Sequence, residues 1–401
     1  MAAMVSDAPA RPGVPSLRWA SRARSVAGVE AELARIWAEA PLTVAADVGA
    51  AGGAREERHV AARSSVLNLV VIARRPEMGE HAAAVITHLA GRHPSRTLIV
   101  SSADPDGPSW LDARIEAQCV LPRPDAAETC IELVYLTVGG ESGRHLNAVV
   151  APLLVHDLPV TVWWPGDTPL GTAPARDLFE LADRVVVDGS SWSGDGLARL
   201  ARLGGLLDDP RLDVVDLALL RQSRWREAIA SAFDLPDLLP FIRSIRSIAV
   251  SYATHEDHEA NVVKPLYHVA WLASRLGFAV VQPLGPRPGG GFGGALRSRR
   301  TPIAVELLPV VSAAAPGTTL HVQLVAERRS VGLAVDVSAD GEGVVVAARR
   351  DGLMPLQRRF LAGRRTEADL LGETIETVGR DPIATAAIRC AAALAGGPAG
   401  S

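Results

Sequence analysis

The stretch DLPVTVWWPGDTPL, residues 157–170, decides the fold. Leu158 to Val162 is a short apolar run followed closely by a Pro-Gly-Asp turn, a pattern typical of a buried strand in a parallel α/β sheet. Trp163 and Trp164 lie at its carboxyl end, the edge where open α/β sheets bind ligands and partners. Consecutive strand side chains point opposite ways, so we do not expect both indoles to be buried on one face. An exposed Trp is a typical interface anchor, although core filling is the preferred interpretation for either indole taken alone.

Strands and helices alternate on the amino-terminal side of this stretch. Val66–Ala73 and Arg96–Ser101 are apolar strand runs, and Glu80–Gly91 between them indicates a helix closed by glycine. Ala113–Leu121 and Cys130–Val138 predict an antiparallel excursion. The fold class is therefore α/β, with a Rossmann-like mixed sheet in the N-terminal half.

The pattern changes after about Leu239. A helix is predicted at Val262–Leu276, and the glycine-rich Pro286–Gly294 follows it. We interpret that segment as a flexible loop, because a dinucleotide fingerprint would need a helix directly after it. The rest predicts an α+β domain with an antiparallel meander of four strands and two final helices: Thr301–Leu308, Thr319–Ala326, Val331–Val337, Gly343–Ala348, Glu367–Val378 and Pro382–Leu394.

Three parts of the chain follow from these patterns. Residues 1–60 form a flexible N-terminal arm with one amphipathic helix at Val26–Ala40. Residues 61–238 form the Rossmann-like α/β domain, and residues 239–401 form the α+β C-terminal domain.

The composition excludes several classes of protein. Hydrophobic residues make up 48% of the 401 residues, and the formal net charge is only −4, so no basic footprint points to nucleic acid. No apolar run reaches membrane-spanning length, and the start of the chain lacks the order of a signal peptide. Three cysteines, an odd and sparse set, do not make a secreted disulfide framework. We expect a cytoplasmic protein without a membrane or nucleic-acid partner.

Lysine is almost absent from the chain. Lys264 is the only lysine among 41 basic residues. The skew towards arginine reflects genomic base composition and weakens any arginine-rich motif as a signal. Lys264 is either a special position or a solvated one beside Pro265, and the sequence leaves both interpretations open.

No catalytic or metal-binding pattern is coherent. The segment His255–Glu259 lacks the H-E-x-x-H order of a zinc site and is interpreted as a solvated acidic loop before a helix. Ser142, His145 and His156 are close in sequence, but no G-x-S-x-G nucleophile elbow accompanies them. We therefore expect neither a cofactor nor a metal, and no enzymatic activity.

The segment Asp216–Asp234 predicts an amphipathic helix with arginines on its polar faces. Such a helix either packs on the sheet and shows its arginines to water, or docks a partner through Arg and Trp, which are common at interface hot spots. Arg221, Arg224 and Trp225 are the candidate contacts, with core packing the preferred role for Trp225.

Several of these segments together resemble the glucose-6-phosphate dehydrogenase assembly protein (OpcA) family. The most specific piece is PLLVHDLPVTVWWPGDTP at residues 152–169. Supporting segments match in order and spacing: VLNLVVIA (66–73), HPSRTLIV (93–100), RVVVDGSSW (184–192), RQSRWREAIASAFD (221–234), YHVAWLASRLGF (267–278) and, more loosely, TPIAVELLPV (301–310).

The resemblance implies a non-catalytic protein that binds glucose-6-phosphate dehydrogenase and promotes its active oligomer. It would act as an allosteric effector at the entry to the oxidative pentose phosphate pathway. We predict a partner-binding surface, part of whose contacts favour the active dehydrogenase: Asp157, Pro159, Trp163, Trp164, Arg221, Arg224 and Trp225. A folded Trp164→Ala variant with undiminished activation would contradict the tryptophan part of this surface.

Two other functions stay open at this point. One is an enzyme that binds a sugar phosphate or nucleotide in the Rossmann-like half; the other is a structural subunit without effect on kinetics. The resemblance also associates cysteines with redox control in some members. Cys119 and Cys130 lie on adjacent predicted strands and could face each other, but we expect these two and Cys390 to be buried free thiols.

Overall fold

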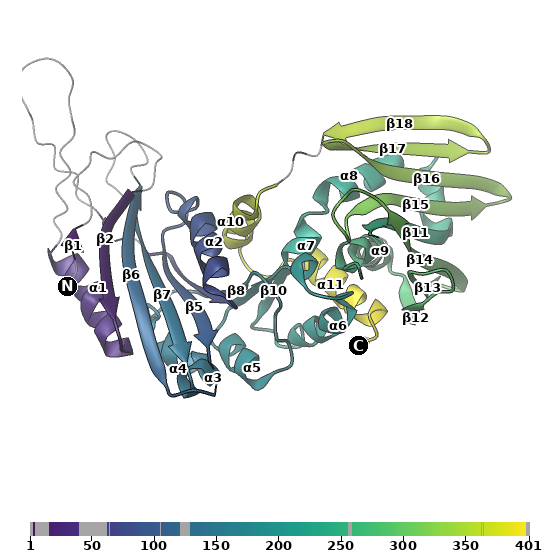
Figure 1. The fold of residues 1–401 in the computed structure, drawn as a ribbon. Coiled ribbons are helices and arrows are strands. Elements are labelled where there is room, and N and C mark those ends of the chain that lie inside the picture. The colour runs from purple at the N-terminus through teal and green to yellow at the C-terminus, as the bar shows by residue number, and fades with distance from the viewer. Residues whose placement is uncertain are drawn as a thin grey trace, which may run out of the picture. The chain divides into compact units, whose positions relative to one another are not determined.

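The computed structural model describes residues 3–4, 16–39, 62–63, 65–104, 106–120, 129–255, 259–361, 363 and 365–397. The chain forms two compact units (Figure 1). The first ends at Val186 and also includes Glu367–Glu376, whereas the second begins at Val187 and resumes at Thr377. The boundary expected between residues 238 and 239 therefore lies inside the second unit, and one helix expected in the C-terminal domain belongs to the first unit.

The first unit is built on a mixed sheet (Figure 1), in the strand order β1-β2-β6-β7-β5-β4-β8-β9. Strands β7, β5, β4 and β8 are parallel, whereas β6 is antiparallel to β7 and β2. The Rossmann-like mixed sheet with an antiparallel excursion is thus confirmed. Its strands are β1 Ala3–Met4, β2 Ser16–Ala23, β3 Ala62–Arg63 (paired with β7), β4 Leu67–Ala73, β5 Ser95–Ala103, β6 Trp110–Val120, β7 Thr129–Gly139, β8 Val160–Trp164 and β9 Arg184–Val187.

Burial explains why the central strands are continuous apolar runs. Every residue of β4 and of β8 is buried, as expected for strands covered on both faces. Asn68 and Thr161 are the polar residues of these two strands. Asn68 donates its side-chain amide to the carbonyl oxygens of Val155 and Leu158 and accepts from the Val155 N–H. The helices of this unit are α1 Val26–Glu39, α2 Pro76–Thr87, α3 Glu141–Arg144, α4 Leu146–Val150, η1 Ala151–Leu153, α5 Ala173–Phe179 and α10 Glu367–Glu376.

The described part of the expected flexible arm is folded. Helix α1 buries one stripe, Val29, Leu33 and Ile36, at the spacing of an amphipathic helix. β2 pairs with β6 in the sheet, so this part of the chain contributes to the first unit. Residues 5–15 and 40–61 lie outside the described residues.

Cys119 and Cys130 form a disulfide between β6 and β7. They are directly opposite in the register of the two antiparallel strands, and both are buried. The expectation of free thiols is therefore wrong for this pair. The sequence predicted that the two strands are adjacent, but not which residues of the two strands face each other. The observed register places the two cysteines directly opposite each other. Cys390 is free.

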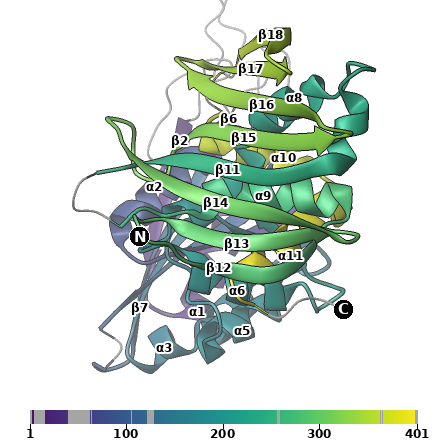
Figure 2. The same ribbon diagram turned by 90° about the vertical axis from the view of Figure 1, so that its right-hand side faces the viewer.

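The second unit contains a large, mostly antiparallel sheet, seen face-on in Figure 2 with α8 and α9 behind it. Its order is β12-β13-β14-β11-β15-β16-β17-β18, and only β11 and β14 are parallel neighbours. The mostly antiparallel sheet of the α+β half is confirmed, with a meander that runs from β15 through β16 and β17 into β18. The first predicted meander strand, β14, does not neighbour β15, because β11 lies between them and is parallel to β14. The strands are β11 Ile245–Thr254, β12 Ala279–Pro286, β13 Phe292–Ser298, β14 Thr301–Val311, β15 Thr319–Arg328, β16 Val331–Asp340, β17 Gly343–Arg350 and β18 Leu353–Leu361.

The glycine-rich segment predicted as a flexible loop is a β-hairpin. Its residues 286–294 supply the end of β12, a turn and the start of β13. Gly289, Gly290 and Gly291 all have positive φ values, of 87°, 94° and 75°. Such values favour glycine, so turn geometry rather than flexibility explains the composition.

Helices of the second unit include α9, which places its apolar stripe in the core. Leu266, Val269 and Ala273 are each 0% exposed, and Gly277 ends the helix in a left-handed conformation. No helix in the described part of the chain has the length and apolarity of a membrane crossing. The remaining elements are η2 Gly189–Ser191, α6 Leu197–Leu206, β10 Asp213–Asp216, α7 Leu217–Leu220, α8 Ser223–Ala232, η3 Leu239–Ser244, α9 Val263–Leu276 and α11 Pro382–Leu394.

Candidate functional site

The first unit has the strand topology that usually creates a ligand crevice. From β4, the chain continues through β5 to β7 on one side, whereas β8 and β9 lie on the other side. The strand order therefore reverses between β4 and β8. In open α/β sheets, ligands bind beyond the carboxyl ends of the strands at such a switch point.

The residues at this switch point do not fit a dinucleotide. Residues 74–76, Arg-Arg-Pro, follow β4 in place of a glycine-rich turn, and Glu77 adds a carboxylate to the first turn of α2. A pyrophosphate needs N–H donors at that helix end, without an opposing charge. The Met78 side chain also packs on the turn after β8, because a Cβ added to Gly166 would lie 2.9 Å from its Cε. Met78 thus takes up space between this helix end and the turn.

Trp163 and Trp164 are buried, so the predicted exposed indole anchor is wrong for this chain. Trp163 is 0% exposed and Trp164 is 6% exposed. The Trp164 ring packs edge-to-face on Phe179 of α5, with centroids 6.0 Å apart. The two indoles point to opposite faces of β8, but both faces are covered, so alternation buries both.

Asp157 and Pro159 lie at the opposite end of the same strand. Both are exposed, before the first residue of β8, and Asp157 has a φ of 63°. The bonds from Asn68 hold the neighbouring backbone in place. The motif that carries the family resemblance therefore divides into an exposed amino end and a buried carboxyl end.

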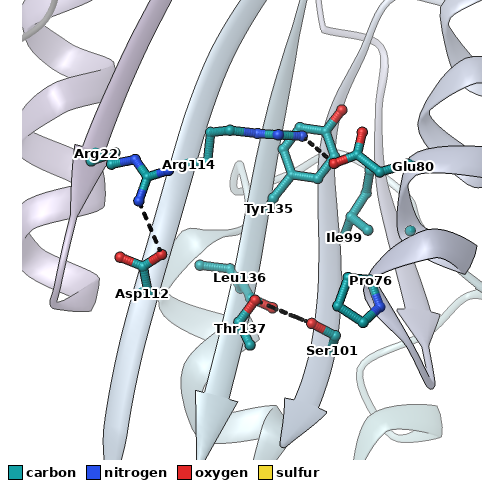
Figure 3. A pocket seen from close by; sticks show the side chains of 11 residues that line it. Arg22, Pro76, Glu80, Ile99, Ser101, Asp112, Arg114, Tyr135, Leu136 and Thr137 are labelled. Carbon is teal, nitrogen blue, oxygen red and sulfur yellow. Dashed lines mark hydrogen bonds and ion pairs between the residues drawn. The ribbon is translucent and has the colours of Figure 1, made fainter.

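A small cavity of about 150 Å³ lies on the first sheet beside α2, and Figure 3 shows its lining. Arg114 stacks over the Tyr135 ring, 3.8 Å from its centroid, and donates to Glu80 at 2.6 Å. Arg22 pairs with Asp112 at 3.7 Å. Burial raises the pKa of Tyr135 to about 12, so its phenol stays protonated at neutral pH. The charges here are mutually compensated, which favours a structural role.

Arg221, Arg224 and Trp225 line one cavity of the second unit. The expected single helix is split into α7 and α8 by a turn at Arg221 and Gln222. The first turn of α8 lines a larger cavity of about 490 Å³. Its charged lining residues are Arg221, Arg224, Lys264, Arg365 and Glu342.

A buried carboxylate holds Arg221 at the edge of this cavity. Asp188 follows β9, is 4% exposed and accepts from the Arg221 guanidinium at 2.5 Å. Ser190 bonds to the same arginine at 3.3 Å and donates its hydroxyl to Asp188 at 2.6 Å. Arg221 is therefore a positioned cation, with its side chain 28% exposed.

Beneath this pair lies a second carboxylate, Asp216, which is 1% exposed. It accepts hydrogen bonds from the Tyr267 hydroxyl at 2.7 Å and from the backbone N–H groups of Gly189 and Ala218, each at 2.8 Å. Burial, followed by repulsion from Asp188, raises the pKa of Asp216 to about 6. This network fixes the start of α7 against the loop after β9.

Trp225 and Arg224 differ in exposure. The Trp225 ring packs on His268 of α9, with centroids 5.3 Å apart, which agrees with the preferred packing role. Burial, followed by the charges of Arg226 and Lys264, lowers the pKa of His268 to about 3. Arg224 is 53% exposed and pairs with Glu227 one turn along the helix, so it is the more accessible of the predicted helix contacts.

Sequence reasoning did not assign Lys264, Arg365 or Glu342 to this cavity. Lys264 stood out as the only lysine, and the structure places it in the first turn of α9, lining the cavity rather than in open solvent. Burial, and then the charge of Arg221, lowers the pKa of its ammonium. Glu342 and Arg365 carry no sequence signal, because tertiary structure brings them to the cavity from beyond β16.

The other catalytic candidates do not assemble. His145 lies on the surface and pairs with Glu141 at 2.9 Å, four residues earlier. Of the predicted acidic loop, residues 256–258 lie outside the described residues. Within the part of the chain that is described, no group of three or more His, Cys, Asp or Glu side chains could hold a metal ion.

Comparison with solved structures found distant similarity. The WlbA dehydrogenase from Thermus thermophilus, solved with NAD and α-ketoglutarate, is 13% identical with a TM-score of 0.43, over 83% of this chain and 96% of that one. The transcriptional regulator Gal80p from Kluyveromyces lactis is 12% identical with a TM-score of 0.42, over 82% and 91%. The comparison with curated proteins found no similar sequence.

Two protein-family profiles match the chain in succession. Residues 86–204 match the N-terminal domain of the glucose-6-phosphate dehydrogenase subunit, and residues 212–388 match its C-terminal domain. Together they span most of the chain. The chain belongs to the OpcA family of glucose-6-phosphate dehydrogenase assembly proteins.

Proposed function

We propose that this protein is a non-catalytic assembly factor and allosteric activator of glucose-6-phosphate dehydrogenase in the cytoplasm. It binds the dehydrogenase, promotes the active oligomer and thereby controls entry into the oxidative pentose phosphate pathway. The observation that carries the proposal is the match of both halves to domains described as parts of a glucose-6-phosphate dehydrogenase subunit.

The packing of the first unit supports a non-catalytic role. An enzyme that used the Rossmann-like half would need a crevice at the switch point between β4 and β8. There, residues 74–76 lack the glycine turn, Glu77 opposes an anion and Met78 packs on Gly166. These features disfavour the alternative of an enzyme that binds a sugar phosphate or nucleotide in this half.

An activator must bind the active dehydrogenase more tightly than the inactive one, because equal binding shifts no equilibrium. A tenfold shift in that equilibrium needs a difference of about 1.4 kcal/mol between the two binding free energies. Arg224 and the exposed end of the family motif, Asp157 and Pro159, are the predicted contacts that remain accessible. In this proposal Trp163 and Trp164 support the motif from within the fold.

The test measures the rate of the cognate dehydrogenase across glucose 6-phosphate concentrations, with and without this protein, together with sedimentation of the mixture. We expect a saturable rise in rate and a shift to a larger dehydrogenase oligomer. Co-sedimentation without any change in rate would contradict the activator proposal and support a purely structural role. Turnover of a sugar phosphate by this protein alone would contradict the non-catalytic proposal.

A further inference from the structure

The cavity beside α8 has the size and the charge of a small-molecule site. Its volume of about 490 Å³ lies within the range of about 300–1,000 Å³ that is typical of ligand pockets. Arg221, Arg224, Lys264 and Arg365 line it, and among the described lining residues only Glu342 is acidic. All of these residues belong to the second unit, so the site is complete within one compact part of the chain.

Lys264 is the cation least compensated by the protein. Arg221 pairs with Asp188 and Arg224 pairs with Glu227. No described carboxylate forms an ion pair with Lys264. Burial and then the charge of Arg221 lower the pKa of its ammonium, whereas the charge of Asp188 raises it. A half-buried ammonium that feels the charge of a guanidinium is unfavourable until an anion joins them.

The cavity also offers neutral donors at the same place. The first turn of α8 contributes Ser223 and the amide end of the helix, where N–H groups lack intrahelical acceptors and favour negative charge. Thr318 and Thr319 line another wall, and Trp225 forms an apolar one. Cations, hydroxyl groups and a partly exposed indole together suit a phosphate joined to a larger polar body.

We propose that this cavity binds a small phosphorylated metabolite, with the phosphate group between Lys264 and Arg221 and the rest of the molecule along Trp225 and Thr318. A free phosphate alone would leave most of the volume unfilled. This inference concerns binding by the purified chain and does not depend on the proposed action on the dehydrogenase.

Isothermal titration of the full chain tests the proposal with four probes: inorganic phosphate, a hexose 6-phosphate, a nucleoside triphosphate and the unphosphorylated hexose. We expect at least one phosphate ester to bind tenfold or more tightly than inorganic phosphate, and no binding of the free hexose. The preferred ester separates a sugar phosphate from a nucleotide. Absence of binding by both esters at millimolar concentration, or equal affinity for inorganic phosphate, would overturn the proposal.

The variant Lys264→Gln identifies the site. We expect it to weaken ester binding at least tenfold while its melting temperature stays equal or rises, because a buried ammonium is removed. Arg349→Gln is the matched control, since Arg349 is 52% exposed and paired with Asp336 on β16, and it should bind as the native chain does. Unchanged ester affinity in Lys264→Gln would overturn the assignment. Weaker dehydrogenase binding by Lys264→Gln, with no ester binding by the native chain, would show instead that an acidic group of the partner enters the cavity.

Discussion

The switch point of the first sheet and the cavity of the second unit differ in whether their side chains leave room and charge for a ligand. The first lies where topology predicts a ligand, yet Met78 packs on Gly166 there and the adjoining Trp163 and Trp164 are buried. No topological rule predicts a ligand site at the cavity of the second unit, yet four cationic residues line its volume of about 490 Å³. The topology of this chain therefore does not by itself indicate where a ligand would bind; the side chains have to be considered as well.

The largest expected effect is on the packed region. Trp163→Ala should lower the free energy of unfolding by about 3–5 kcal/mol, because it empties the space of a fully buried indole. Urea unfolding at neutral pH measures the change. An effect below about 1 kcal/mol would show that the switch-point edge is loosely packed and would weaken the contrast with the cavity.

The disulfide should stabilise the first unit alone, because Cys119 and Cys130 both lie in it. Their separation of 11 residues corresponds to about 3 kcal/mol of loop-closure stabilisation. Reduction should therefore speed amide hydrogen exchange in β6 and β7 and leave β15 and β16 unchanged. Equal exchange in reduced and oxidised protein would contradict a stabilising bond.

Two buried side chains near the cavity, His268 and Asp216, make the stability of the fold depend on pH. His268 has a pKa of about 3 in the folded chain, below its unfolded value. Its contribution to the stability of the fold is therefore present above about pH 6.5 and is lost as the pH falls. Asp216 has a folded pKa of about 6, above its unfolded value. Its contribution is present below about pH 4 and is lost as the pH rises through 6.

The two groups oppose each other between pH 7 and pH 5. Acidification over this range should lower the free energy of unfolding by about 2 kcal/mol through His268 and raise it by about 1 kcal/mol through Asp216. His268→Gln should therefore lose less stability than the native chain on acidification, and Asp216→Asn should lose more. Urea titrations at both pH values measure these differences, and identical pH slopes in all three proteins would contradict the buried positions of the two groups.

The smallest expected effect concerns the surface of α8. Arg224→Glu should weaken dehydrogenase binding about tenfold, or about 1.4 kcal/mol, through loss and reversal of an exposed charge. Arg349→Glu is the control, since the two side chains are 53% and 52% exposed and both are ion-paired. If the control weakens binding and Arg224→Glu does not, the partner contacts the other face of the second sheet.

Much of the fold could be predicted because local patterns and tertiary structure agree. Helix α11 has the predicted bounds, Pro382–Leu394, and the four meander strands lie where their apolar patterns place them. The prediction failed where local sequence was ambiguous. Alternation places Trp163 and Trp164 on opposite faces but does not say that both faces are covered, and glycine-rich residues 286–294 suit a hairpin turn as well as a loop.

The candidate site could be predicted only in part. Arg221, Arg224 and Trp225 belong to one short segment, so nearness in sequence grouped them, although the expected single helix is split into α7 and α8. Their supporting residues come from distant segments: Asp188 follows β9, and Lys264 begins α9. No local pattern connects such positions, and a lone lysine signals only that the position is unusual.

The most direct test of the account is the rate of the cognate glucose-6-phosphate dehydrogenase across substrate concentration, with and without this protein at saturating amounts. If the protein is an activator, the rate or the substrate affinity of the dehydrogenase rises saturably, and this protein alone turns over no substrate. An unchanged rate together with absence of binding would contradict it and would direct attention to an independent ligand-binding role for the second unit.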